Sequence, residues 1–286
     1  MSVPKLQRAL LPLLLLLVLL TGCEAAAPAQ PTVIDLSSIP AYSGQAYVEL
    51  NGNIPFFTQE ELTTESFEEY SPLDDLGRCG TAYACIGTDL MSTEPRGAIG
   101  QVKPSGWRTA KYDFVNSRYL YDRCHLIGFQ LTGENANERN LITGTRYLNV
   151  VGMLPFENLT ADYIKETDGH VLYRVTPVFS GDDLVADGVV MEAMSVEDGG
   201  DGVLFCVYCY NVQPGVAIDY ATGDSAPDGS IQDDQVSLVL NTNTKKFHLD
   251  SCPSVTEMKE EYRQEYTGSR AVLEAQGYAP CGRCKP

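Results

Sequence analysis

Apolar residues alternate with polar ones, or run together as β-branched and aromatic side chains, in four segments that we expect to be strands. These segments are residues 119–125, 171–179, 184–196 and 203–212. Gly-Asp-Asp and Asp-Gly-Gly-Asp-Gly sequences separate the last three, as turns do between antiparallel strands. Pro155 begins a run with apolar residues at helical spacing, which predicts an amphipathic helix with proline in its first turn. Long strands with one well-marked helix predict an α+β fold. The apolar residues of that helix are Phe156, Leu159, Tyr163 and Ile164.

The N-terminus has the pattern of an export signal. Lys5 and Arg8 precede an apolar run over residues 10–20, which is too short to span a bilayer, and Leu-Thr-Gly-Cys follows. This ending resembles a bacterial lipobox, which implies that residues 1–22 are removed and that Cys23 carries the lipid. The alternative is a secretory signal with an incidental cysteine. Either way we expect an extracytoplasmic protein, anchored to the cell membrane or secreted.

Composition divides the rest of the chain. Residues 23–40 are rich in Ala and Pro and predict a tether. Residues 223–235 concentrate Gly, Asp, Ser and Pro without apolar periodicity and predict a linker. We therefore expect a main domain over residues 41–222 and a small module over residues 236–286.

The chain is strongly acidic, with a net charge of −18 and a pI near 4.4. Nucleic-acid-binding domains are usually basic, so overall charge argues against that function, and any such function needs a local basic site. Residues 96–123 supply one, with six basic and two acidic residues, whereas residues 24–95 carry twelve acidic residues and only Arg78. Such a basic segment can contact phosphates without reading sequence.

Nine cysteines allow disulfides in an oxidising compartment. Cys206 and Cys209 form a CxxC, but on a strand residues three apart point to opposite faces, so we expect them to pack in the core. This also argues against a thiol redox protein. Cys79 and Cys85 flank a small loop and are open to either a disulfide or two free thiols.

The candidate chemistry begins at His125, one of three histidines, which ends the sequence Asp-Arg-Cys-His. An Asn-rich loop with Asn140 follows, then Asn149, and Glu157 comes eight residues after Asn149. This pattern resembles the DNA/RNA non-specific endonucleases of the ββα-metal fold, in particular those of Gram-positive bacteria. The resemblance covers about residues 45–222 and implies a ββα-metal core on an antiparallel sheet.

The resemblance implies a role for each of these residues. His125 is the general base, and its ordinary pKa near 6.5 suits proton abstraction at neutral pH. Asn149 is the direct ligand of Mg²⁺, which takes few protein ligands, and Glu157 holds the ion through water. Asn140 orients the site or contacts phosphate.

Two arginines complete the implied site, and two positions depart from the family pattern. Arg96 and Arg123 are candidates for binding the substrate phosphate, although the spacing of Arg96 from His125 does not fix its role. Cys124 replaces the usual glycine of the motif, and Ala161 stands where some members have arginine.

The C-terminal segment contains a second set of candidate metal ligands. His-x₃-Cys and Cys-x₂-Cys form two close pairs suited to tetrahedral Zn²⁺. It resembles the small zinc modules related to the Ada metal-binding domain, with histidine in place of one cysteine. Disulfide bonding among the three cysteines is the alternative. Val255, Met258, Tyr262 and Tyr266 lie at helical spacing and predict a helix between the pairs. The proposed ligands are His248, Cys252, Cys281 and Cys284.

Together these patterns predict an extracytoplasmic, Mg²⁺-dependent endonuclease that hydrolyses DNA and RNA to 5′-phosphate products. A lipid anchor at Cys23 would hold it at the membrane, and Zn²⁺ would be structural. The alternative is a surface lipoprotein that binds nucleic acid without cutting it.

Overall fold

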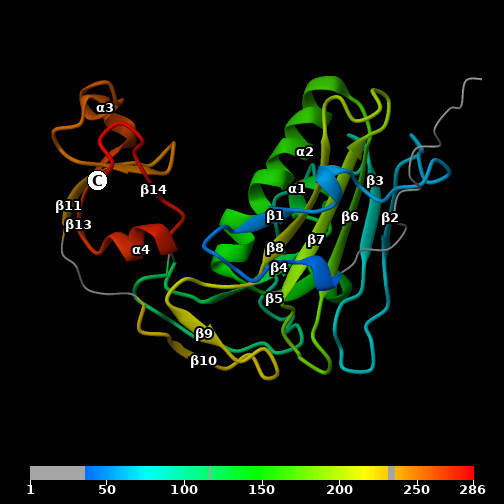
Figure 1. The fold of residues 1–286 in the computed structure, drawn as a ribbon. Coiled ribbons are helices and arrows are strands. Elements are labelled where there is room, and N and C mark those ends of the chain that lie inside the picture. The colour runs from blue at the N-terminus through cyan, green and yellow to red at the C-terminus, as the bar shows by residue number, and fades with distance from the viewer. Residues whose placement is uncertain (1–35, 116, 231–235) are drawn as a thin grey trace, which may run out of the picture. The chain divides into compact units, whose positions relative to one another are not determined.

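The computed structural model describes residues 36–115, 117–230 and 236–286 (Figure 1). The predicted signal over residues 1–22, Cys23 and most of the predicted tether lie outside the described residues. Within the described ranges, no helix combines the length and apolarity needed to cross a membrane.

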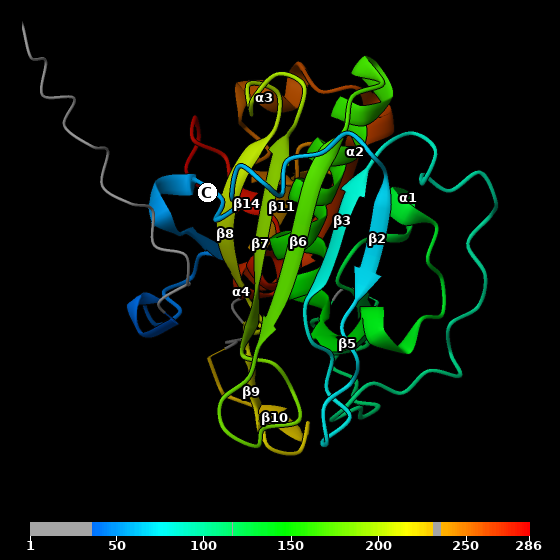
Figure 2. The same ribbon diagram turned by 90° about the vertical axis from the view of Figure 1, so that its right-hand side faces the viewer.

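The main domain is built on a six-stranded sheet in which each neighbouring pair of strands is antiparallel. Figure 2 shows the long central strands of this sheet side by side. In spatial order the strands are β1 (Tyr47–Glu49), β8 (Leu204–Tyr210), β7 (Gly188–Ser195), β6 (Val171–Val178), β3 (Ala82–Ile86) and β2 (Phe67–Tyr70).

The predicted strands over residues 171–179, 184–196 and 203–212 are confirmed as β6, β7 and β8, and they are consecutive neighbours in the sheet. β7 begins four residues later than predicted, at Gly188. The residues before it turn away from the sheet, and Val185 N donates instead to Tyr220 O at 2.9 Å. Cys206 and Cys209 lie in two different hydrophobic clusters, as expected for opposite faces of a strand.

One face of the sheet is covered by the helix α2 (Leu154–Thr167), which confirms the helix predicted from Pro155 (Figure 1). The predicted apolar face is only partly right. Ile164 is fully buried, but Leu159 is 45% exposed, while Glu157 faces inward with 7% exposed. A short helix, α1 (Phe129–Thr132), contributes Leu131 to the same core. The opposite face of the sheet packs against the N-terminal segment, including the 3₁₀ turn η2 (Asn51–Asn53) and, before it, the partly buried Ile39 and Tyr42.

A separate antiparallel pair, β4 (Tyr121–His125) and β5 (Leu141–Thr145), packs its Cys124 and Ile142 into the core below α2. A π-helical turn, η4 (Leu148–Met153), follows β5 and continues directly into α2. The chain therefore runs strand, strand, helix, the order expected for a ββα core. A 3₁₀ turn, η3 (Glu138–Asn140), leads into β5, and η1 (Leu36–Ser38) begins the described chain.

The predicted linker contains regular structure at its start. β10 (Ser225–Pro227) pairs with β9 (Val216–Ile218) as an antiparallel hairpin. The folded main domain thus continues beyond residue 222.

The C-terminal module has a four-stranded sheet and a core of its own around Leu238, Phe247 and Leu273. The helix predicted from Val255 to Tyr266 is wrong beyond its first turn. Tyr266 instead lies in a strand that pairs with β11 (Val236–Asn241) along six residues, and this pairing overrides the local spacing. In spatial order the strands are β13 (Arg263–Gly268), β11 (Val236–Asn241), β12 (Lys246–His248) and β14 (Ala279–Pro280), and the helical segments are α3 (Pro253–Thr256), η5 (Glu260–Tyr262) and α4 (Arg270–Ala275).

Candidate active site

His125 is the last residue of β4, and both of its ring nitrogens have defined partners. Nε2 lies 2.9 Å from the backbone carbonyl oxygen of Asn135, and Nδ1 lies 3.1 Å from Nη2 of Arg96. A carbonyl oxygen only accepts hydrogen bonds, so Nε2 carries the proton and Nδ1 presents a lone pair. The structure thus brings Arg96 to His125 from 29 residues away in sequence.

The surroundings of His125 keep its imidazole neutral. Burial has the largest effect and lowers its pKa. The hydrogen bond to the Asn135 carbonyl opposes this, and the nearby Arg96 guanidinium lowers the pKa further. The side chain is 5% exposed. A neutral imidazole whose Nδ1 lone pair can accept a proton is the form that a general base requires.

Asn149 lies in the π-helical turn η4, and its amide orientation is fixed by Asp122. Nδ2 donates to Asp122 Oδ2 at 2.7 Å, and Arg146 Nη1 donates to the same oxygen at 2.9 Å. The amide oxygen Oδ1 is therefore turned away from Asp122 and is left to accept. The sequence pattern contained Asp122 but assigned no role to it or to Arg146. Both roles depend on the pairing of β4 with β5, which sequence spacing does not reveal.

Cys124, which stands in place of the family's glycine, is fully buried and packs against Gly144 of β5. A Cβ added at Gly144 would lie 2.5 Å from the Cβ of Cys124. The missing side chain at Gly144 thus makes room for the thiol. The thiol donates to Asn149 Oδ1 at 3.4 Å, so Cys124 touches the proposed metal ligand.

Glu157 points into the protein from α2. A Cβ added at Gly128 would lie 2.8 Å from one carboxylate oxygen of Glu157, so the glycine lets the carboxyl group approach the loop after β4. Burial raises the pKa of Glu157 to about 7, although Arg96 lowers it. A divalent cation near this carboxyl group would favour its ionised form.

Asn140 is fully buried and its amide is used within the protein. Nδ2 donates to Ile127 O at 2.9 Å, and Ile127 N donates to Oδ1 at 2.9 Å. These two bonds hold the backbone that follows His125. Of the two predicted roles, orienting the site is favoured, because the amide is neither exposed nor free to contact phosphate.

Arg123 is held in place by the loop before it. Its Nη2 donates to Gly100 O at 2.8 Å, its Nε donates to Val102 O, and the guanidinium lies 4.0 Å from the centre of the Trp107 ring. Such a guanidinium is a fixed positive charge at the surface of the site.

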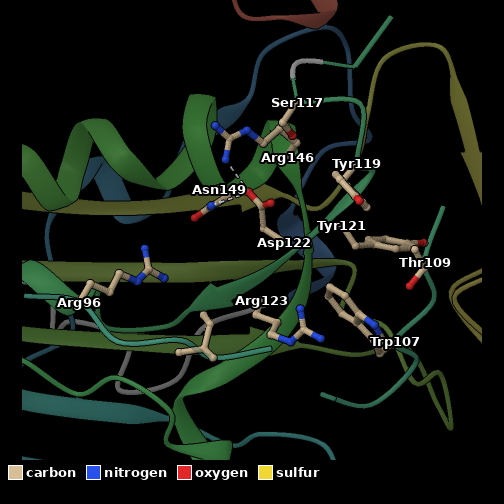
Figure 3. A pocket seen from close by; sticks show the side chains of 11 residues that line it. Arg96, Trp107, Thr109, Ser117, Tyr119, Tyr121, Asp122, Arg123, Arg146 and Asn149 are labelled. Carbon is tan, nitrogen blue, oxygen red and sulfur yellow. Dashed lines mark hydrogen bonds and ion pairs between the residues drawn. The ribbon is translucent and has the colours of Figure 1, made fainter. Parts of the chain in front are cut away.

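A cavity of about 670 Å³ connects several of these residues (Figure 3). Arg96, Arg123 and Asn149 line it together, and His125 contacts Arg96 at its edge. Its volume is in the range of small-molecule and substrate sites. The full lining is Arg96, Ile99, Trp107, Thr109, Ser117, Tyr119, Tyr121, Asp122, Arg123, Arg146 and Asn149.

The four predicted zinc ligands come together in the C-terminal module. The ligand atoms of His248, Cys252, Cys281 and Cys284 all lie within 4.8 Å of one another. His248 ends β12, Cys252 precedes α3, and the other two cysteines follow β14. Loops from three different elements thus converge on one point.

The chemistry of this cluster fits a metal. Both ring nitrogens of His248 are buried without a hydrogen-bond partner, which is costly unless they bind something. Burial opposes ionisation of Cys281, but backbone hydrogen bonds from Cys284 and Arg283 lower its pKa to about 7. A thiolate and a neutral imidazole are the ligand forms that Zn²⁺ takes.

The eight cysteines within the described ranges are free thiols. Of the two alternatives for Cys79 and Cys85, the structure has two free thiols and not a disulfide. Cys79 Sγ donates to Leu141 O at 3.2 Å, and Cys85 Sγ donates to Thr63 O at 3.1 Å.

Residues 58–197 match the family model of the DNA/RNA non-specific endonucleases. A deoxyribonuclease of Streptococcus dysgalactiae subsp. equisimilis is 27% identical over 216 residues, which is 58% of this chain and 62% of that protein. The chain thus spans less than two thirds of that relative's length. These likenesses support the non-specific endonuclease family and a hydrolytic nuclease.

Two solved nuclease structures have a similar fold. NucA from Streptococcus agalactiae with a magnesium ion bound superimposes with a TM-score of 0.57 at 25% identity, covering 65% of this chain and 88% of that one. The Sda1 nuclease with a bound zinc ion gives 0.55 at 26% identity, covering 65% and 98%. The mixed fold dominated by antiparallel sheet is therefore that of known nucleases.

Proposed function

We propose that this protein is an Mg²⁺-dependent, sequence-non-specific endonuclease that hydrolyses DNA and RNA to 5′-phosphate products. The observation that carries the proposal is the buried His125, whose Nδ1 lone pair faces the Arg96 guanidinium. A neutral imidazole beside a cation suits abstraction of a proton from water next to a bound phosphate.

His125 Nδ1 takes the proton from the attacking water, and the Asn135 carbonyl stabilises the imidazolium that forms. Arg96 exchanges its contact with Nδ1 for a phosphate oxygen and so offsets the growing negative charge. Attack in line with the 3′ oxygen leaves the phosphate on the 5′ side.

The residues present fit a hydrated Mg²⁺. Asn149 Oδ1 would be the direct ligand, since Asp122 holds the other end of the amide. Glu157, a buried carboxyl group, would accept hydrogen bonds from the waters of the ion. When bound, the cation neutralises the phosphate and the leaving oxygen. A similar fold with bound magnesium supports the choice of ion.

The test is cleavage of plasmid and of RNA by the purified chain with Mg²⁺ and with excess chelator. We expect nicking, linearisation and RNA degradation that the chelator stops, and a His125→Ala variant slower by roughly two to four orders of magnitude. The control is His170→Ala, which removes a histidine paired with Glu197 outside the cavity and should cut normally. Cleavage to 3′-phosphate ends would rule out this mechanism. Binding without cleavage would favour the alternative, a surface lipoprotein that only holds nucleic acid.

We propose that the C-terminal module binds one structural Zn²⁺ through His248, Cys252, Cys281 and Cys284. The convergence of four ligand atoms within 4.8 Å supports this, as do the unpartnered nitrogens of His248. Mass spectrometry of the native full chain should find one zinc. His248→Ala should lose it, whereas His170→Ala should keep it. A native chain with the three cysteines in disulfides and no zinc would contradict the proposal.

We also propose that the protein is extracytoplasmic and held to the bacterial membrane by a lipid on Cys23. This rests on the sequence pattern at residues 1–23. In a bacterial host the chain should label with fatty acid, and Cys23→Ser should abolish the label. Labelling that persists in the variant would exclude this anchor.

A further inference from the structure

The cavity beside the proposed catalytic residues has two chemically different parts. In Figure 3 Arg96 lies on one side of Arg123, and three aromatic residues lie together on the other. Arg146 and Asp122 close the cavity near Asn149. The proposed mechanism uses the cationic part and leaves the aromatic part, made of Trp107, Tyr119 and Tyr121, without a role.

The aromatic part is rigidly built. Tyr121 is 3% exposed and its hydroxyl donates to Gly223 O at 3.1 Å. Trp107 is partly buried beneath the guanidinium of Arg123, 4.0 Å from its ring centre. These contacts hold the two rings in place before any ligand binds, so binding a flat ligand would cost little conformational entropy at these side chains.

Tyr119 is the exception, because it leaves an aromatic ring at the surface. It is 44% exposed, and Lys111 Nζ lies 4.5 Å from its ring centre. An aromatic ring flanked by a cation and beside a phosphate-binding arginine is the combination that proteins use to hold single-stranded nucleic acid. The three arginines against one aspartate in the lining also favour an anionic ligand.

We propose that the aromatic part of this cavity is a base-binding subsite, which stacks an unpaired base of the substrate strand against Tyr119 and Trp107. The phosphate attached to that nucleotide then faces Arg123. This inference rests on the proposed nuclease function and names the form of substrate that the same site takes.

The subsite predicts a preference for single strands. A base in a duplex is already stacked and paired, so placing it in the cavity requires unstacking it first. Single-stranded DNA and RNA present their bases freely. Because every base has an aromatic face, stacking adds affinity without adding sequence specificity.

Trp107 makes the proposal directly measurable, since it is the only tryptophan in the chain. Binding is followed by Trp107 fluorescence on the full-length protein, with chelator present to prevent cleavage. The probes are an octathymidylate, an abasic oligomer with the same number of phosphates, and a duplex of the same length. We expect the octathymidylate to quench the emission, and the abasic oligomer to bind at least about tenfold more weakly without quenching.

A matched pair of variants locates the effect. Tyr119→Ala should weaken binding of the octathymidylate by roughly 5- to 140-fold and leave binding of the abasic oligomer unchanged. Tyr47→Ala removes a tyrosine of similar exposure, 41%, on β1 outside the cavity, and should change neither. If the two oligomers bind equally well and Trp107 emission does not respond, the cavity is not a base subsite.

Kinetics separate this inference from the proposed function. With Mg²⁺, Tyr119→Ala should raise KM for single-stranded DNA by the same factor as the binding loss while leaving kcat near normal. A wild-type protein that cleaves plasmid but binds the octathymidylate and the abasic oligomer equally well would overturn the subsite alone. A protein that cleaves nothing would overturn the proposed function, and the fluorescence titrations would still decide the subsite.

Discussion

The carboxyl group of Glu157 is the most perturbed acid of the candidate site. It is 7% exposed, and burial raises its pKa from 4.5 to about 7 despite the opposing effect of Arg96. Because the folded pKa lies above the unfolded value, the folded state binds the proton more tightly. The resulting stability is complete below pH 4.5 and is lost as the pH rises through about 7.

This shift gives a prediction for the metal-free protein. Between pH 4.5 and pH 8 the free energy of unfolding should fall by up to about 3 kcal/mol more in the wild type than in Glu157→Gln, whose amide does not titrate. Urea unfolding at several pH values with chelator present measures the difference. Parallel pH profiles for the two proteins would show that the carboxyl group is not held in its neutral form.

Asp122 Oδ2 accepts hydrogen bonds from Asn149 Nδ2 and Arg146 Nη1, so we expect it to orient the Asn149 amide. Asp122→Ala frees the Asn149 amide to rotate, so we expect the Mg²⁺ concentration for half-maximal activity to rise by roughly 10- to 100-fold. At saturating Mg²⁺ much of kcat should return. Asp162→Ala, an exposed aspartate on α2, is the control. An unchanged Mg²⁺ response in Asp122→Ala would mean that the amide orientation is set by other contacts.

At the scale of elements, β4 and β5 accommodate Cys124, which stands where the endonuclease motif that this chain resembles has a glycine, because the neighbouring Gly144 on β5 has no side chain. Cys124 fills the space that Gly144 leaves open. Gly144→Ala should therefore cost about 1–3 kcal/mol of stability, the usual range for overpacking a core. In a Cys124→Gly background the same substitution should cost much less. Unfolding measurements on the four proteins of this cycle give the coupling, and Gly100→Ala, which meets no atom within 4 Å, is the control.

The elements differ in how well the sequence predicts them. β6, β7 and β8 were predictable because apolar, β-branched and aromatic residues run along each strand, and α2 was predictable from Pro155 and the apolar residues at helical spacing after it. β13 was not, because Tyr266 is fixed by pairing with β11 and not by its neighbours in sequence. Glu157 interrupts the apolar period of α2, because its carboxyl group faces inward, which is unfavourable unless a partner or a cation stabilises it.

The candidate site follows the same division. The roles of His125, Asn149 and Glu157 stay predictions, but these residues were identifiable as candidates because their identities and intervals lie on one continuous stretch of chain. The contact of Arg96 with His125 and the orientation of Asn149 by Asp122 were not, because both depend on how distant segments fold together. The clustering of His248, Cys252, Cys281 and Cys284 was predictable from two short spacings, although the elements between the two pairs were not.

At the scale of the whole molecule, the net charge and the charge of the cavity lining have opposite signs. The chain carries a net charge of −18, yet three arginines line the cavity against one aspartate. Asp122 is already paired with Arg146, so the remaining two arginines present unbalanced positive charge. We therefore expect the local field of the cavity, and not the overall charge, to attract a nucleic-acid substrate.

The boundary of the main domain gives the last prediction. The segment that lines the cavity contacts residues beyond 222. Tyr121 Oη donates to Gly223 O at 3.1 Å, and Arg108 pairs with Asp224 at 3.0 Å. β10 also completes the hairpin with β9.

Two truncated chains that both lack the C-terminal module should therefore behave differently. The chain that ends at Gly229 keeps these contacts and should retain most of its activity on short DNA. The chain that ends at Thr222 loses them all, and its melting temperature and its activity should both fall, because Trp107 and Tyr121 lose the support that fixes the cavity. Thermal unfolding and cleavage assays on the pair measure this, and equal behaviour of the two chains would place the boundary at residue 222 after all.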